Sequence, residues 1–274
     1  MSTGNINANY KKLLKELDRV NTENTISVYV PSVKKTVKFK AITVKQQKDI
    51  IKSASDPTLM NLAFNVTVNN IIKDNCIDSG VNFKLHDKVP ILLALRAHTI
   101  SKDYTFSDDE GESKVDLLSH LKSLKSVGID KETLSFTLSV DNITIECTAP
   151  SLDIDTAVNR DALRALGNKG VDVDEITQFK LIETVGDMYT YELIKYIDNV
   201  SITPADAEAP DVIDFADVNT IQKLNILEAL PMSLSRQFVD HVGEYKKFEN
   251  RALTPDENNE SAIITLDPSF FATE

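Results

Sequence analysis

The chain has 274 residues, a hydrophobic share of 42%, a charged share of 26% and a formal net charge of −12. With only eight glycines and nine prolines, the composition excludes a collagen-like or largely disordered chain and fits a globular protein of one or two domains. The most apolar stretch, residues 89–95, is far shorter than the roughly 20 residues that cross a bilayer, so we expect no membrane segment.

The two cysteines, Cys76 and Cys147, stand apart from each other and from any histidine cluster. Isolated thiols of this kind are typical of a reducing compartment. The first residues contain no apolar run like that of a signal peptide. Together these features predict a soluble intracellular protein.

Positive charge is concentrated near the start of the sequence. Residues 1–52 contain eleven basic and four acidic residues, whereas the remainder contains 19 basic and 38 acidic residues. The stretch YVPSVKKTVKFKAITVKQQKDIIKSA, residues 29–54, has seven lysines and one acid. Because most of the surface would repel phosphate, this asymmetry argues against a general polyanion binder and favours a protein that docks in a fixed orientation.

In the first half, the pattern predicts a helix, a hairpin and further helices. An apolar stripe predicts a polar, basic helix over residues 7–20. Period-two alternation predicts strands at 26–30 and 36–40. Thr43 and Gln46 form a capping-box pattern, which predicts a helix that begins at Val44. Two more helices are expected over residues 56–76, opened by Asp56-Pro57, and 87–99.

In the second half, the acid-rich stretch YTFSDDEGES, residues 104–113, is interpreted as a surface loop. A hairpin is predicted from strands at 134–140 and 143–148, with its turn at Asp141-Asn142. The remaining predictions are helices over 117–128, from Pro150 to Gly167, over 176–200, over 218–230 and over 233–248.

The two halves therefore share an order of signals, a hairpin followed by helices, over 26–99 and 134–248. We expect an α+β, helix-dominated fold with two short β-hairpins, and the shared order raises the hypothesis of a duplicated ββααα unit. The predicted division is an N-terminal arm (1–25), an N-terminal module (26–101), a connecting acidic loop and helix (102–131), a C-terminal module (132–253) and a C-terminal linker and docking segment (254–274).

The sequence lacks the usual catalytic and metal-binding patterns. Its histidines are scattered, with no HExxH pair, and there is no GxSxG or phosphate-loop motif. Asp153-Ile154-Asp155 resembles the DxD of phosphoryl-transfer sites, but its place at a helix start favours capping. We therefore expect no enzyme, no catalytic residue, no cofactor, no metal and no small-molecule substrate. An enzyme with an unrecognised site would need perturbed carboxylates that converge in a pocket.

The lysine-rich hairpin has three interpretations: a solvated face, a docking face for an acidic partner, or a nucleic-acid surface. Only Tyr29 and Phe39 could stack on bases there, and both are predicted to point inward, which argues against nucleic acid. A nucleic-acid-associated regulator that uses this basic block nevertheless stays the alternative function. The candidate docking residues are Lys34, Lys35, Lys38 and Lys40.

The final segment, AIITLDPSFFATE, combines strand character at residues 262–266 with an Asp267-Pro268 turn and two phenylalanines. Phe270 and Phe271 would each lose roughly 1.5–3 kcal/mol if left in water, so they are expected to occupy a groove. That groove lies either on this protein's own core or on a partner, with the strand then added to the partner's sheet.

The stretch 29–54 resembles the opening of baseplate hub subunit and assembly proteins of T-even-type contractile-tailed bacteriophages. The shared features are a turn at Pro31-Ser32, the apolar KFKAIT at 38–43 and the Gln/Lys-rich QQK at 46–48. DKVPILLALRAHTIS (87–101) is similar to a helix of that family, and ILEALPMSLSRQFVDHV (226–242) to its closing helix pair. The order of these motifs, rather than any single one, carries the resemblance.

The resemblance implies a non-enzymatic structural or assembly protein of the tail baseplate hub. Its partners would be other hub or tail proteins, and it would be found in the virion and, during assembly, in the host cytoplasm. The chain is longer than the compact members of that family, so its middle and its end are expected to carry contacts of its own.

Overall fold

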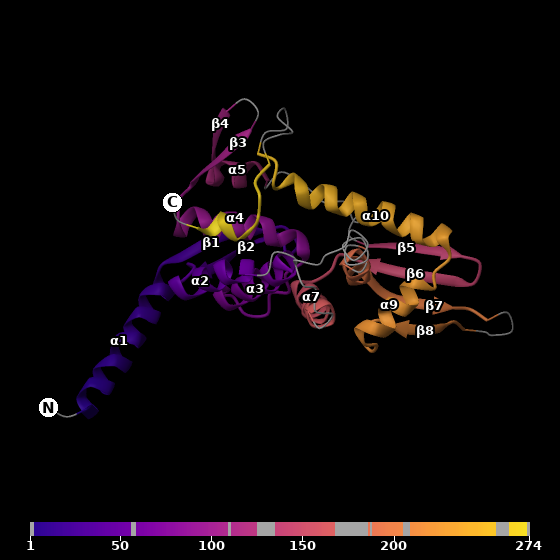
Figure 1. Cartoon of the computed structure of the whole chain (residues 1–274), viewed down its shortest axis with the longest axis horizontal. Helices are drawn as coiled ribbons and strands as arrows, with labels where there is room; N and C mark the ends of the chain where they lie inside the picture. Colours follow the sequence, from indigo (N-terminus) through magenta and orange to yellow (C-terminus); the bar gives the residue numbers. More distant parts are fainter. Residues whose placement is uncertain are drawn as a thin grey trace, which may run out of the picture.

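The computed structural model describes residues 3–55, 59–108, 111–124, 135–167, 186, 188–204, 209–255 and 263–272. The fold is α+β and dominated by helices, with small antiparallel sheets. Its first half begins with the long helix α1 (Thr3–Glu23), which projects away from the body (Figure 1). The hairpin of β1 (Thr25–Val30) and β2 (Lys35–Lys40) follows, as predicted.

Three helices follow: α3 (Met60–Asn75) and α4 (Lys88–Thr99) pack against this hairpin, and α2 (Val44–Lys52) packs against α3. The predicted capping box of α2 is confirmed, because the Thr43 hydroxyl accepts from the Gln46 amide and the Gln46 side chain bonds back to the Thr43 amide. α4 is almost wholly buried over 88–95, which explains its continuous apolar sequence. The predicted start of the third helix at Asp56-Pro57 lies outside the described residues.

The predicted acidic surface loop is wrong, because residues 103–108 and 111–116 are paired strands. β3 (Asp103–Asp108) pairs with β4 (Gly111–Asp116), and α5 (Leu117–Leu124) follows directly. Tyr104 and Val115 are cross-strand partners whose side chains pack against the core. This apolar contact stabilises the strand pair although the surrounding sequence is rich in acidic residues. The predicted end of the helix at Gly128 lies outside the described residues.

The second half contains one four-stranded antiparallel sheet in the order β5-β6-β7-β8. The predicted hairpin is confirmed as β5 (Ser135–Val140) and β6 (Ile143–Thr148), with Asp141 at a φ of 50° in the turn. The other strands are β7 (Ile197–Ile202) and β8 (Asp211–Asp214). Helices α7 (Leu152–Gly167), α9 (Thr220–Glu228) and α10 (Met232–Arg251) complete this half, and α10 contacts β5 (Figure 1).

The prediction of one helix over 176–200 is wrong at its C-terminal end. Residues 188–193 are helical, but a 3-10 turn, η4 (Ile194–Tyr196), then leads into β7. Leu193, Ile197 and Val200 fit helical spacing by coincidence, and pairing with β6 decides for the strand. With β7 and β8 inserted between its helices, the second half does not repeat the element order of the first.

The two halves share one continuous hydrophobic core. Helix α3 packs against α7, and backbone bonds join residues 83–85 to 150–152. The Leu85 amide donates to the Pro150 carbonyl at 2.8 Å, and the Leu152 amide donates to the Phe83 carbonyl at 2.9 Å. The C-terminal segment contains a short 3-10 helix, η5 (Pro268–Phe271), which lies beside α2 and α4. Residues 263–266, predicted to have strand character, are not a strand.

Candidate interaction surfaces

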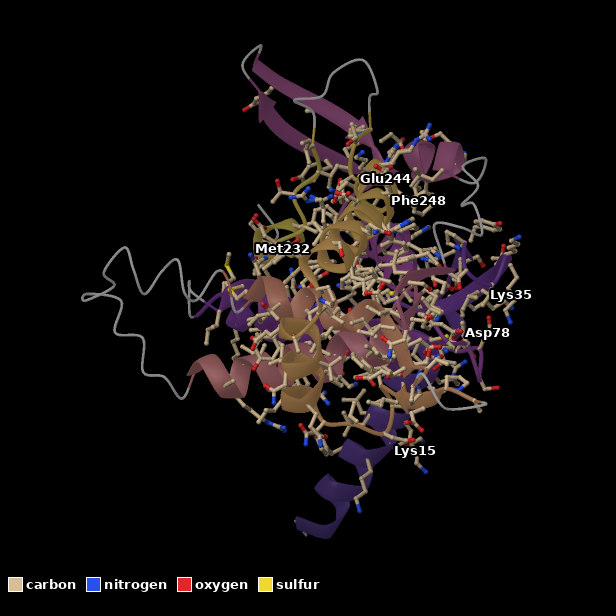
Figure 2. The ribbon with its side chains drawn as sticks, turned by 90° about the vertical axis from the view of Figure 1, so that its right-hand side faces the viewer. Lys15, Lys35, Asp78, Met232, Glu244 and Phe248 are labelled. Carbon is tan, nitrogen blue, oxygen red and sulfur yellow. The ribbon has the colours of Figure 1, made fainter. Side chains whose placement is uncertain are left out.

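The lysines of the first hairpin lie at its turn and along β2. Alternation along the strand turns Val37 and Phe39 into the core and leaves Lys38 exposed on the opposite face. Lys35 shares the parity of Val37 and Phe39 but is exposed at the first position of the strand, next to the turn. Lys34 is exposed in the turn, where its φ is 51°. Figure 2 shows Lys35 at an outer edge of the molecule. The hairpin from 25 to 40 carries four lysines and no acid. Lys34, Lys35 and Lys38 are exposed, whereas Lys40 is partly buried and pairs with Asp18, so the docking role of the four candidate lysines stays a prediction.

Helix α1 extends this surface with an unusual apolar stripe. Every residue from Asn9 to Thr25 is exposed. The stripe consists of side chains that are between 39% and 58% exposed: Tyr10, Leu13, Leu14, Leu17 and Val20. A bond of 3.3 Å between Lys40 and Asp18 ties the C-terminal end of the helix to β2. Sequence analysis found the stripe but gave no sign that it would stay uncovered.

Phe270 and Phe271 lie in a groove of the same chain, with 1% and 0% of their surfaces exposed. The Asp267 carboxylate caps η5 by accepting from the Ser269 and Phe270 amides. Arg96 of α4 donates to the Phe270 carbonyl at 2.7 Å, and its guanidinium lies 5.0 Å from the Phe270 ring centroid. The structure thus matches the alternative of an own-core groove, and a role of these two residues in partner docking stays a prediction without an exposed surface to support it.

The segments that carry the resemblance meet in the folded chain. The buried Asp87 carboxylate accepts from the Ser32 amide at 2.9 Å, from the Ser32 hydroxyl and from the Lys84 amide. This joins the Pro31-Ser32 turn to the start of α4. The Gln47 side chain donates to the Phe271 carbonyl at 2.7 Å, so the Gln/Lys-rich helix helps to hold the C-terminal segment. These motifs therefore serve to lock the body together.

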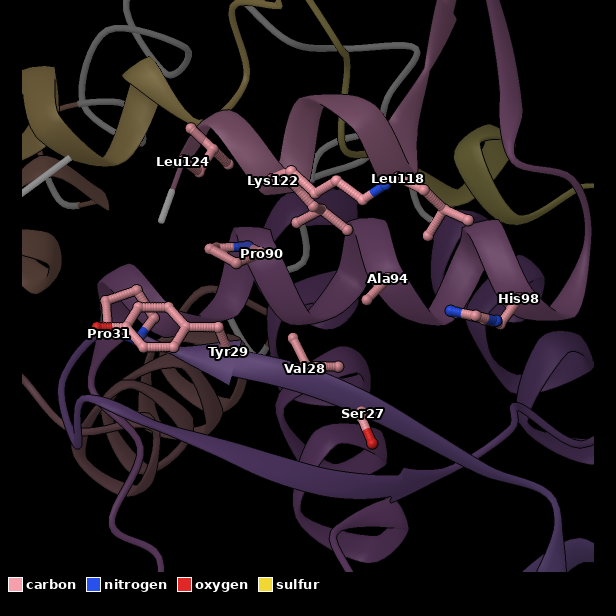
Figure 3. Close-up of a pocket in the computed structure, with 11 residues that line it drawn as sticks. Ser27, Val28, Tyr29, Pro31, Pro90, Ala94, His98, Leu118, Lys122 and Leu124 are labelled. Atoms are coloured by element: carbon pink, nitrogen blue, oxygen red, sulfur yellow. The ribbon is translucent and has the colours of Figure 1, made fainter. Parts of the chain in front are cut away.

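A cavity of about 220 Å³ lies between β1, α4 and α5 (Figure 3). Its walls are mostly apolar, and its titratable side chains are Tyr29, His98 and Lys122. The lining residues are Ser27, Val28, Tyr29, Pro31, Pro90, Ala94, His98, Leu118, Leu121, Lys122 and Leu124. The lining has no carboxylate and no nucleophile next to a base. His98 and Lys122 are side chains of types that can transfer a proton, but among the described lining residues no hydrogen bond pairs either of them with Ser27.

The chemistry that sequence analysis missed is a buried charge network between the halves. The Asp155 carboxylate in the first turn of α7 accepts from Lys195 of η4 at 2.7 Å and from Lys88 of α4 at 3.3 Å. Asn69 of α3 donates to it at 2.6 Å, and Lys195 also pairs with Glu192. Asp155 was interpreted as a helix cap, but the Ser151 hydroxyl accepts from the Ile154 amide instead.

Burial and charge perturb this network in opposite directions. Burial alone would raise the pKa of Asp155, but the Lys88 and Lys195 ammonium groups lower it below the ordinary 3.8. Burial would lower the pKa of Lys195, and the Asp155 and Glu192 carboxylates raise it. Burial raises the pKa of Glu249, on the facing side of α10, to about 7. The Asp155 carboxylate and the Lys195 ammonium group form a buried ion pair with each other, so the geometry indicates a structural junction between the two halves.

The described residues contain no group of three or more His, Cys, Asp or Glu that could hold a metal ion. Within the same residues, no helix is both long and apolar enough to span a membrane.

His86 is buried, and its pKa is lowered by that burial. Its Nδ1 lies 2.9 Å from the Tyr245 hydroxyl, so this contact joins α10 to the residues just before α4.

The chain belongs to the family of T4 bacteriophage base plate proteins, whose model matches residues 22–237. It is therefore a structural component of a phage tail baseplate, and such a component contacts other phage proteins. Comparisons with curated proteins and with solved structures found no match. The matched range covers both halves of the body, whereas most of α1 and the C-terminal segment lie outside it.

Proposed function

We propose that this protein is a non-enzymatic structural or assembly protein of the baseplate hub and that it acts through protein–protein interfaces. The observation that carries the proposal is the basic surface of the first hairpin. Lys34, Lys35 and Lys38 are exposed, and no carboxylate in the described part of the chain forms an ion pair with their ammonium groups, although the Asp78 carboxylate accepts from the Lys38 backbone amide at 2.9 Å. Exposed lysines of this kind contribute little to stability, which leaves them available to a partner.

Charge complementarity is the basis on which the first hairpin would dock to a partner. The hairpin is basic on a chain with a net charge of −12, so an acidic patch on a neighbouring hub protein would be attracted to it and repelled elsewhere. Such steering acts mainly on the association rate and on orientation, and it weakens as salt rises. The surface therefore favours docking in one orientation into a larger assembly.

The test is the double variant Lys34→Glu/Lys35→Glu, supplied to phage that lack this protein. We expect fewer completed baseplates and, for binding to hub proteins, an association rate reduced about tenfold or more at low salt, with the difference shrinking at high salt. A matched control, Lys114→Glu/Lys247→Glu, makes the same charge change on β4 and α10, where both lysines are exposed.

Normal baseplate assembly by the β2 double variant would contradict the docking role. If instead the unaltered protein binds random duplex DNA tightly at physiological salt, and the β2 variant loses that binding, the basic surface belongs to a nucleic-acid-associated regulator.

A further inference from the structure

We propose that α1 pairs with α1 of a second copy of this chain, in an antiparallel arrangement centred near Lys15. The proposal concerns a surface other than the lysines of β2 and does not depend on the hub role. It starts from the isolation of the helix. α1 is 21 residues long, leaves the body as an arm (Figure 1; Lys15 in Figure 2) and is exposed on all sides from Asn9 onward.

An isolated helix with an exposed apolar stripe is stabilised when another element packs against that stripe. Most helical stability in proteins comes from packing of an apolar face, and a single helix in water is marginal. The five side chains of the stripe repeat at the spacing 10, 13, 17 and 20, with Leu14 beside them. This three-and-four spacing is that of a two-helix seam, in which side chains of one helix insert between those of the other.

The symmetry of the stripe points to a second copy as the cover. Tyr10 and Val20 lie five residues on either side of residue 15, and Leu13 and Leu17 lie two residues on either side of it. In an antiparallel pair with its two-fold axis near residue 15, Tyr10 therefore faces Val20 of the second copy. Leu13 faces Leu17 in the same way, so a tyrosine meets a valine at each end of the seam and leucines meet leucines between them.

Charge supports the same orientation. The N-terminal part of α1, residues 3–15, has three lysines and no acid, whereas residues 16–23 have three acids and one arginine. With the axis near residue 15, an antiparallel pair brings Lys12 of one copy to the level of Asp18 of the other, twice by symmetry. Lys11 is then level with Arg19, whose guanidinium pairs with Glu16 and Glu23 of its own helix. A parallel pair would instead place the three lysines of the two copies side by side, at a cost in repulsion.

The contact is small, because about five side chains per helix fall below the area of a standard stable interface. The pair is therefore a weak, concentration-dependent dimer that forms when copies are brought together in an assembly. The first test is sedimentation equilibrium over a hundredfold range of concentration that reaches the high micromolar. We expect the mass to rise from 30.5 kDa toward twice that value.

Leu17→Glu should shift dimer formation to concentrations about tenfold or more higher, with the melting temperature unchanged, because Leu17 contacts no core. The matched control Thr22→Glu adds the same charge outside the stripe and should leave the dimer intact. A monomer at every concentration would overturn the proposal, as would a dimer that Leu17→Glu does not weaken. If Leu17→Glu blocks baseplate assembly while the unaltered chain is monomeric, the occupant is another protein and the proposal is also overturned.

Cross-linking tests the orientation in a Cys76→Ser background, with Cys147 left in place because it is buried. Chains with Tyr10→Cys are mixed with differently tagged chains with Val20→Cys and then oxidised. We expect disulfides between the two kinds of chain to form at least about tenfold faster than disulfides between two Tyr10→Cys chains. Faster bonding between two Tyr10→Cys chains would indicate a parallel pair and contradict the proposal.

Discussion

The two ends of the chain carry similar apolar side chains and use them in opposite ways. At the C-terminal end, Phe270 and Phe271 are buried in the body and held by Arg96 and Gln47. At the N-terminal end, the stripe of α1 is exposed. An apolar cluster near a terminus is therefore not enough to identify a docking segment. What separates the two ends is whether the body provides a groove with polar groups that match the backbone of the segment.

The lysines divide in the same way. Lys88 and Lys195 are buried and pair with Asp155 at the junction of the halves, whereas Lys34, Lys35 and Lys38 are exposed on the first hairpin. Buried lysines contribute to holding the body together, and exposed ones remain available to partners. Substitutions at the two kinds of site should consequently affect different measurements.

The largest effect on stability is expected at Asp155. Asp155→Asn leaves two buried ammonium groups without their carboxylate, so the free energy of unfolding at pH 7 should fall by about 3–5 kcal/mol. Asp153→Asn is the matched control two residues away, since its side chain is 70% exposed, and it should cost less than about 1 kcal/mol. Urea unfolding at pH 7 checks both values. Equal losses for the two variants would contradict the assignment of Asp155 to a buried junction.

The difference in stability between the unaltered chain and Asp155→Asn should also depend on pH. The folded-state pKa of Asp155 is below 3.8, so its carboxylate stabilises the fold fully above the unfolded pKa and loses that contribution as pH falls below it. Urea unfolding from pH 6 downward should therefore show the gap between the unaltered chain and Asp155→Asn narrowing below about pH 4.

The next largest effect is expected for the C-terminal segment. Phe271→Ala removes a fully buried ring and should lower the free energy of unfolding by about 3–4 kcal/mol. Leu17→Ala removes a large apolar side chain from the other end, where 51% of it is exposed, and should change stability by less than about 1 kcal/mol in the monomer. Thermal unfolding at low protein concentration compares the two variants. A loss of stability for Leu17→Ala as large as that for Phe271→Ala would contradict the difference proposed between the two ends.

The smallest effect is expected on β2. The double variant Lys34→Glu/Lys35→Glu should change the free energy of unfolding by about 1 kcal/mol or less, because both side chains are exposed. The main effect of this variant is expected on binding to hub proteins and on baseplate assembly. A loss of several kcal/mol would mean that these lysines have a structural role and would remove the main support for a docking surface.

Local signals predicted the elements whose boundaries depend on neighbouring residues. The Thr43–Gln46 capping box, the hairpin turn at Asp141 and the end of α7 at Gly167 all follow from residues within one turn of the chain. The helix over 218–230 is likewise found as α9. The family resemblance was also visible because its motifs lie in these locally determined segments.

Features that depend on distant partners could not be predicted in this way. β7 is a strand because β6 lies beside it, and Asp155 is buried because Lys88 and Lys195, 67 and 40 residues away in sequence, converge on it. Phe271 contacts Gln47 across 224 residues. Whether an apolar stripe is covered likewise depends on the whole body, which is why the exposure of α1 emerged only with the structure.

The contrast between the ends is tested most directly by two truncated chains, one without residues 1–23 and one without residues 263–274. Calorimetry of both, at a concentration where α1 is unpaired, measures what each end contributes to the body. We expect the melting temperature to stay within about 2 °C without α1, and to fall by about 10 °C or more without the C-terminal segment. The account would be contradicted by a large fall on loss of α1 or by an unchanged melt on loss of residues 263–274.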